Sequence, residues 1–117
     1  MTNTDSIRFL SAEVDQFARE RDWRQFHNPK NLVMLLISEA GELAAEYRWV
    51  DSGNSDAILD EANKRSAVKD EIADVAIALI ALCNRTQIDL GPTIAEKLAK
   101  NAIAYPVDTA RGKSERA

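Results

Sequence analysis

Two pairs of acidic residues in the sequence have the spacing needed to act together on one side of a helix. They are Glu39 with Glu42 and Glu71 with Asp74. Residues three apart on a helix are neighbours, so each pair presents two carboxylates side by side. The spacing alone is not specific, because about three such pairs are expected by chance at this acid content. The sequence around each pair therefore carries the argument.

Both pairs border apolar sequence and have few cations nearby. Glu39 continues the apolar stripe of the two preceding helical turns, and Asp74 directly precedes the apolar run 75–83. Close in sequence, only Arg48 follows the first pair and only Lys69 precedes the second. An ionised carboxylate at the edge of a core is costly unless it is paired or binds a metal.

Two helices that packed with these faces together would surround one cleft with four carboxylates. Oxygen ligands of this kind suit Mg²⁺, which keeps further positions open for phosphate oxygens and water. The alternative is that both pairs are solvated helix faces whose basic partners come from elsewhere in the chain. Glu46 lies one turn beyond Glu42. We expect it either to support the metal site or to form an ion pair with Arg24 or Arg48.

The composition narrows the class of protein. The 117 residues are 45% apolar, which corresponds to one domain with a core. Nineteen acids against 15 Lys and Arg give a net charge of −4, which disfavours a nucleic-acid polymer as partner. No apolar run approaches the roughly 18 residues of a membrane span, and no secretory signal is visible, so we expect a cytoplasmic protein without membrane contact. The single cysteine and single histidine exclude a disulfide framework and sites that need two histidines.

Apolar spacing and capping residues predict an all-α fold of four antiparallel helices. Asn28 and Pro29 supply the start of the second helix, and Pro106 ends the fourth. The third helix is apolar on all sides along 75–83, so we expect it to be central and buried, with Cys83 as a packing residue. The predicted helices cover approximately residues 6–20, 28–49, 60 or 66 to 85, and 92–104.

Several motifs, in order along the chain, resemble the MazG-like all-α nucleotide pyrophosphohydrolases, and among them most closely the dCTP pyrophosphatase branch. The motifs lie at residues 21–27, 31–32, 39–44, 49, 70–74 and 105–106. The resemblance runs from about residue 15 to 106 and rests on the combination of two acid motifs with the Trp-x-x-Phe-His segment. It implies a MazG-like nucleotide pyrophosphohydrolase domain at residues 1–106. The segment 107–117 is basic and has almost no apolar residues, so we expect a disordered tail there.

The resemblance also implies an activity and a site. Family members hydrolyse a nucleoside triphosphate to the monophosphate and pyrophosphate, here dCTP or a related pyrimidine deoxynucleotide, in sanitation of the nucleotide pool. They assemble as homodimers or homotetramers with helices packed across subunits. By this resemblance the catalytic Mg²⁺ ligands are Glu39, Glu42, Glu71 and Asp74. The implied substrate-binding residues are Trp23, Arg24, Gln25, Phe26, His27, Trp49, Lys97, Asn101 and Tyr105.

Three positions depart from the family pattern. Ser38 replaces the first of two adjacent glutamates, which leaves the number of metal ions open. Val14 replaces a histidine and Ala78 replaces an aromatic residue, both of which touch substrate in relatives. The alternative to an enzyme is a non-catalytic helical interaction or nucleotide-binding module whose acids are surface charges.

Overall fold

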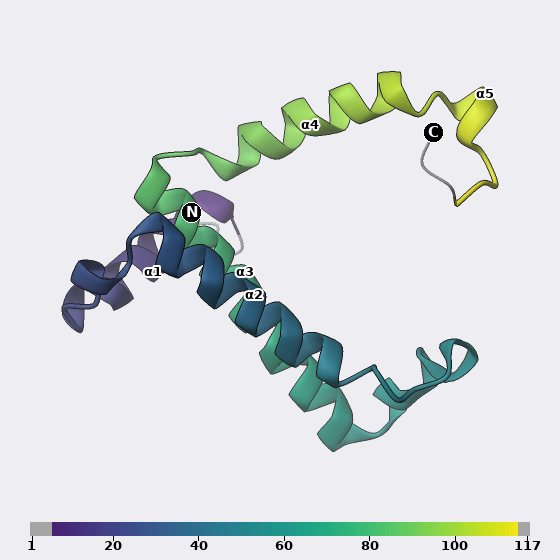
Figure 1. The fold of residues 1–117 in the computed structure, drawn as a ribbon, viewed down its shortest axis with the longest axis horizontal. Coiled ribbons are helices and arrows are strands. Elements are labelled where there is room, and N and C mark those ends of the chain that lie inside the picture. The colour runs from purple at the N-terminus through teal and green to yellow at the C-terminus, as the bar shows by residue number, and fades with distance from the viewer. Residues whose placement is uncertain (1–5, 115–117) are drawn as a thin grey trace.

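The computed structural model describes residues 6–114, and over that range it contains helices and no strands (Figure 1). The four long helices that the sequence predicts are all present. Short 3₁₀ turns, η1 to η3, lie in the connections on either side of α2. In chain order the elements are α1 (Ile7–Glu20), η1 (Arg24–Phe26), α2 (Pro29–Ala45), η2 (Ser52–Asn54), η3 (Ala57–Asp60), α3 (Ala62–Thr86), α4 (Leu90–Ala104) and α5 (Val107–Ala110).

The helix starts follow from local side-chain chemistry. Ser6 and Asn28 each accept a hydrogen bond from the backbone N–H three residues later, at 3.0 and 2.9 Å. Pro29 opens α2, where its missing N–H costs nothing. At the start of α3 the Glu61 carboxylate accepts hydrogen bonds from the backbone N–H groups of Asn63 and Lys64. These caps explain why the predicted starts lie within a few residues of the observed ones.

The helices α2 and α3 form an antiparallel pair that is the centre of the molecule (Figure 1). The helix α1 packs against the C-terminal half of α3, while α4 turns away after α3 and extends from the pair (Figure 1). The buried core is correspondingly small and consists of Ala18, Leu32, Val68, Ala78, Ile80 and Cys83. The single chain therefore does not close its four helices into one bundle.

This open shape leaves much apolar surface in water. The radius of gyration is 17.3 Å, against about 13 Å for a compact domain of this length. The accessible surface is 9306 Å², against about 6,300 Å² for a folded monomer of this mass. Large apolar side chains stay exposed on every long helix, among them Leu10, Met34, Ile37, Ile72, Leu98 and Ile103.

Three details differ from the expectations. The helix α2 ends at Ala45, so Trp49 lies in the turn beyond it. The helix α3 is central, and Cys83 is buried as expected, but Ile77 is 47% exposed, so one face of the apolar run is uncovered. The short helix α5 lies in the range expected to be a disordered tail, whose last residues, 115–117, lie outside the described part of the chain. No helix within residues 6–114 is long and apolar enough to cross a membrane.

Candidate metal and nucleotide site

Four carboxylates from the central helix pair converge on one point, and we call them the acid cluster. Glu39 and Glu42 come from α2, and Glu71 and Asp74 come from α3. One oxygen of each lies within 4.8 Å of one oxygen of every other. The helices run antiparallel, so the two pairs meet only because α2 and α3 pack with these faces together. The structure thus brings together all four acids that the sequence singles out.

Two of these carboxylates have an oxygen that is shielded from water. Oε2 of Glu39 and Oε2 of Glu71 are buried and have no hydrogen-bond partner in the described part of the chain. Burial raises the pKa of Glu39, and repulsion from Glu42 and Asp74 raises it further. Burial followed by repulsion from Glu42 likewise raises the pKa of Glu71. The apo cluster is therefore an electrostatically unfavourable arrangement.

No basic side chain relieves this repulsion within residues 6–114. The ion pairs found there join Arg19 and Arg24 to Asp15, Arg21 to Glu20, and Lys64 to Glu46. None of them involves the acid cluster, so no basic residue within 6–114 supplies the missing charge through an ion pair. Converging carboxylate oxygens without partners are the donor set of a hard divalent cation such as Mg²⁺. The residues present fit such an ion.

Glu46 does not join the cluster. Its Oε2 lies 2.6 Å from Nζ of Lys64, and both side chains are half-buried between the end of α2 and the start of α3. The prediction that Glu46 pairs with Arg24 or Arg48 is wrong, because Lys64 faces Glu46 across the helix pair. This ion pair ties together the ends of α2 and α3 one turn from Glu42.

Residues 23–27, which we call the tryptophan segment, connect α1 to α2. The segment begins after Asp22, whose φ of 54° turns the chain sharply. The ring of Trp23 packs edge-on against those of Phe17 and His27, with centroids 5.8 and 6.5 Å away. Within the segment, Arg24, Gln25 and Phe26 are exposed and His27 is half-buried. The segment is therefore a fixed turn whose polar and aromatic groups remain accessible.

Trp49 lies at the opposite end of α2. Its side chain is 87% exposed, and the guanidinium of Arg48 sits 5.5 Å from its ring centroid. The 17 residues of α2 separate Trp49 from His27, which corresponds to about 25 Å along the helix axis. One chain by itself does not bring Trp49 and the tryptophan segment to the same place.

The remaining predicted substrate residues lie on or just after α4. Lys97 is exposed, while Asn101 and Tyr105 are half-buried. Because α4 extends away from the α2–α3 pair (Figure 1), these residues do not join the acid cluster of their own chain. Of the positions that depart from the family, Ser38 is exposed beside Glu39, and Ala78 is only 2% exposed in the core.

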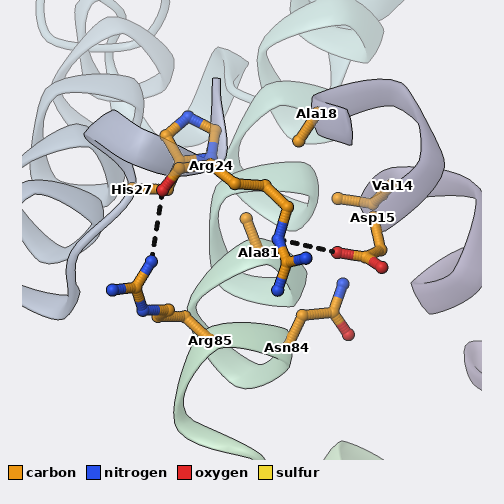
Figure 2. A pocket seen from close by; sticks show the side chains of 8 residues that line it. All are labelled: Val14, Asp15, Ala18, Arg24, His27, Ala81, Asn84 and Arg85. Atoms are coloured by element: carbon orange, nitrogen blue, oxygen red, sulfur yellow. Dashed lines mark hydrogen bonds and ion pairs between the residues drawn. The ribbon is translucent and has the colours of Figure 1, made fainter. Parts of the chain in front are cut away.

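The structure also reveals polar residues that the sequence reasoning did not single out. A small pocket between α1, η1 and α3 is lined by Val14, Asp15, Ala18, Arg24, His27, Ala81, Asn84 and Arg85 (Figure 2). In it, Asp15 pairs with Arg19 and Arg24, and Asn84 and Arg85 bond to backbone oxygens of other elements. The Asp15–Arg19 pair was detectable from its four-residue spacing, whereas contacts across the fold carry no such local signal.

The fold and the acid cluster together define an all-helical protein that presents four carboxylates from two antiparallel helices. The sequence matches the MazG-like family over residues 37–117. The chain belongs to the MazG-like family.

The chain is also similar in sequence to named mammalian proteins. The chain is 39% identical to dCTP pyrophosphatase 1 of Rattus norvegicus over 110 residues, which cover 94% of this chain and 63% of that protein. It is 39% identical to dCTP pyrophosphatase 1 of Homo sapiens over 112 residues, which cover 96% of this chain and 64% of that protein. The chain thus spans somewhat less than two thirds of the length of these relatives.

A solved structure shares the fold. A pyrophosphatase from Archaeoglobus fulgidus DSM 4304 superposes with a TM-score of 0.80 at 29% sequence identity. The match covers 91% of this chain and 97% of that one. The all-α architecture predicted from the sequence is confirmed.

Proposed function

We propose that this protein is a Mg²⁺-dependent pyrophosphohydrolase of a deoxynucleoside triphosphate, with dCTP or a related pyrimidine nucleotide as substrate. The observation that carries the proposal is the acid cluster, with its buried, unpartnered oxygens on Glu39 and Glu71. Four converging acids, which have no basic partner among residues 6–114, repel a triphosphate unless divalent cations reverse the local field. The similarity to dCTP pyrophosphatase 1 supports the choice of substrate.

In the proposed reaction Glu39, Glu42, Glu71 and Asp74 hold the metal. Bound there, Mg²⁺ would supply positive charge to offset the triphosphate and to polarise the α-phosphoryl group. Glu39 is our candidate for the group that orients the attacking water and accepts its proton. Its Oε2 atom, like that of Glu71, is buried and has no hydrogen-bond partner among the described residues. The products are the nucleoside monophosphate and pyrophosphate.

The tryptophan segment and Trp49 are proposed to bind the base and sugar. An aromatic ring stacked on a base contributes about 1 to 3 kcal/mol in proteins that bind single strands. Trp49, at 87% exposure, has the free ring face that such stacking needs. Lys97, Asn101 and Tyr105 are proposed to contact the triphosphate or base.

These groups are spread over one chain, which leads us to propose a homodimer or homotetramer. The tryptophan segment, Trp49 and the α4 residues lie at three separate places around the acid cluster. The surface excess of about 3,000 Å² over a compact monomer is enough for a stable interface. We propose that a second copy covers the exposed apolar side chains of α4, among them Leu98 and Ile103. Light scattering should give a multiple of 13.0 kDa, and Leu98→Glu should lower it.

The deciding experiment is a turnover panel. Purified protein is incubated with canonical and modified deoxynucleoside triphosphates, with and without Mg²⁺, and monophosphate and pyrophosphate are measured. We expect Mg²⁺-dependent release of both products, fastest with a pyrimidine nucleotide. Mg²⁺-dependent nucleotide binding without turnover would favour the alternative of a non-catalytic nucleotide-binding module. If neither turnover nor nucleotide binding is observed, the result would favour the alternative of a helical interaction module whose acids are surface charges.

We also propose that the protein acts in the cytoplasm, in sanitation of the nucleotide pool. The boundary between a domain at residues 1–106 and a basic tail at 107–117 remains a prediction. A chain truncated after residue 106 should then retain turnover.

A further inference from the structure

The tryptophan segment is held mostly by bonds that are local in sequence. The Trp23 N–H donates to the carbonyl oxygen of Ala18 at 3.0 Å, and Nδ2 of Asn31 donates to the carbonyl oxygen of Phe26 at 2.9 Å. These bonds attach the segment to α1 and α2, the helices that it connects. They do not fix its position against α3, which carries Glu71 and Asp74.

One side chain makes that connection. Nη1 of Arg85, in the last turn of α3, donates a hydrogen bond of 3.2 Å to the backbone oxygen of Arg24 (Figure 2). The same oxygen accepts the N–H of His27 at 3.2 Å. Among the described residues, this is the only hydrogen bond from α3 to the tryptophan segment.

The surroundings of Arg85 favour this hydrogen bond over an ion pair with a carboxylate. The Arg24 guanidinium is drawn away toward Asp15, with Nε and Oδ1 3.7 Å apart, so the two arginines do not compete for one acceptor (Figure 2). Asp15 is already paired with Arg19 at 2.7 Å. No ion pair to Arg85 is present within residues 6–114.

The pocket beside Arg85 is too small to be a base-binding site. It encloses about 30 Å³, room for a water molecule or two. Arg85 lines this small pocket and not the neighbouring larger one, of about 310 Å³, that Arg24 and Asn84 also line.

We propose that Arg85 is a positioning residue that fixes the tryptophan segment on α3 and thereby sets the affinity for the nucleotide. The inference rests on the proposed function. Through α3 the geometry joins the acid cluster, at the middle of the helix, to the segment at its end. Arg85 acts through the backbone of Arg24 and does not touch the substrate itself.

Steady-state kinetics of the full chain with dCTP and Mg²⁺ test the first consequence. Arg85→Gln should raise KM about three- to tenfold, the range expected for one hydrogen bond, and leave kcat within about twofold. Arg85→Lys keeps a cationic donor and should recover part of the loss. The matched control is Arg65→Gln on the same helix, whose side chain makes no hydrogen bond or ion pair within residues 6–114, and it should leave KM unchanged.

Fluorescence of the nucleotide-free protein tests the second consequence without relying on turnover. In a Trp49→Phe background Trp23 is the sole tryptophan. Adding Arg85→Gln should make Trp23 more accessible to acrylamide quenching, and adding Arg65→Gln should not.

The outcomes separate the possible roles of Arg85. A raised KM with unchanged Trp23 quenching would mean that Arg85 binds substrate directly, and would overturn the proposal. A lower melting temperature with unchanged KM and quenching would mean that Arg85 only offsets the helix dipole, and would also overturn it. If the wild-type chain turns over no nucleotide, the proposed function fails, while the quenching result still decides whether Arg85 positions the segment.

Discussion

The acid cluster and the C-terminal end of α3 use polar groups in opposite ways. The N-terminal half and middle contribute Glu71 and Asp74 to the acid cluster, where buried oxygens have no partners in the described chain. The last turns contribute Asn84 and Arg85, whose side chains donate hydrogen bonds to backbone oxygens of α1 and η1. The carboxylates of the acid cluster repel one another in the absence of a cation, whereas Asn84 and Arg85 connect α3 to other elements.

This contrast separates function from stability along a single helix. Buried polar groups in folded proteins are normally satisfied, so an unsatisfied pair of carboxylates points to a ligand. Satisfied bonds between distant segments point to architecture. The same helix therefore carries part of the candidate metal site at its middle and connects to other elements at its end.

The largest expected effect is on turnover when the acid cluster is changed. Glu42→Gln and Asp74→Asn should abolish product release. The loss should exceed the roughly 10- to 100-fold decrease that is typical when a residue supporting a metal ligand is removed. Both variants should fold, because they relieve repulsion between neighbouring carboxylates. Product release is measured under the panel conditions, with the exposed Glu13→Gln as control. Full activity in either variant would remove the acid cluster from the mechanism.

Mg²⁺ binding should increase the free energy of unfolding of the protein. At Mg²⁺ about 100-fold above its dissociation constant, the wild-type chain should gain about 2.7 kcal/mol in free energy of unfolding. Thermal melts should show an increase of roughly 10 °C. Glu42→Gln should lose most of this response and Glu13→Gln should keep it. Equal stabilisation of all three proteins would place the Mg²⁺ elsewhere.

Trp49 tests whether binding extends beyond the end of α2. Trp49→Ala should raise KM for dCTP about fivefold or more and change kcat less, because stacking contributes mainly to binding. Its stability should hardly change, since the ring is 87% exposed. Trp49→Phe, which keeps an aromatic face, should show a smaller effect. An unchanged KM in the alanine variant would remove Trp49 from the substrate site.

The smallest expected effect belongs to the C-terminal end of α3. Asn84→Ala removes the hydrogen bond of 2.9 Å from Nδ2 to the backbone oxygen of Ser11. It should lower the free energy of unfolding by about 1 kcal/mol. Denaturant unfolding with and without Mg²⁺ measures both the loss and the metal response, which should match that of the wild type. A lost Mg²⁺ response in this variant would break the division between the acid cluster and the C-terminal end of α3.

Much of the fold was predictable because its signals are local. The cap at Asn28, the proline at position 29 and the stop at Pro106 all act within a few residues of the helix ends that they define. The end of α2 was less predictable. The chain leaves the helix at Ala45 although residues 46–49 contain no glycine or proline, so no local breaker marks the end.

The acid cluster was predictable for a related reason. Its two pairs follow the helical spacing, and their apolar surroundings place them at the edge of the core. The partner of Glu46 was not predictable, because Lys64 lies 18 residues away and meets it only across the helix pair. The hydrogen bond of Arg85 was equally unpredictable, since its acceptor lies 61 residues earlier in the chain.

From the residues alone it follows that the protein is helical, that it carries two acid pairs at helical spacing, and that the MazG-like motifs occur in order. These properties depend on contacts within one or two helical turns. The tertiary structure decided that the pairs meet, that no cation among the described residues neutralises them, and that Trp49 stands about 25 Å along α2 from the tryptophan segment. Those facts depend on how whole helices pack, and helix packing is set by burial of apolar faces over the entire chain and not by local spacing.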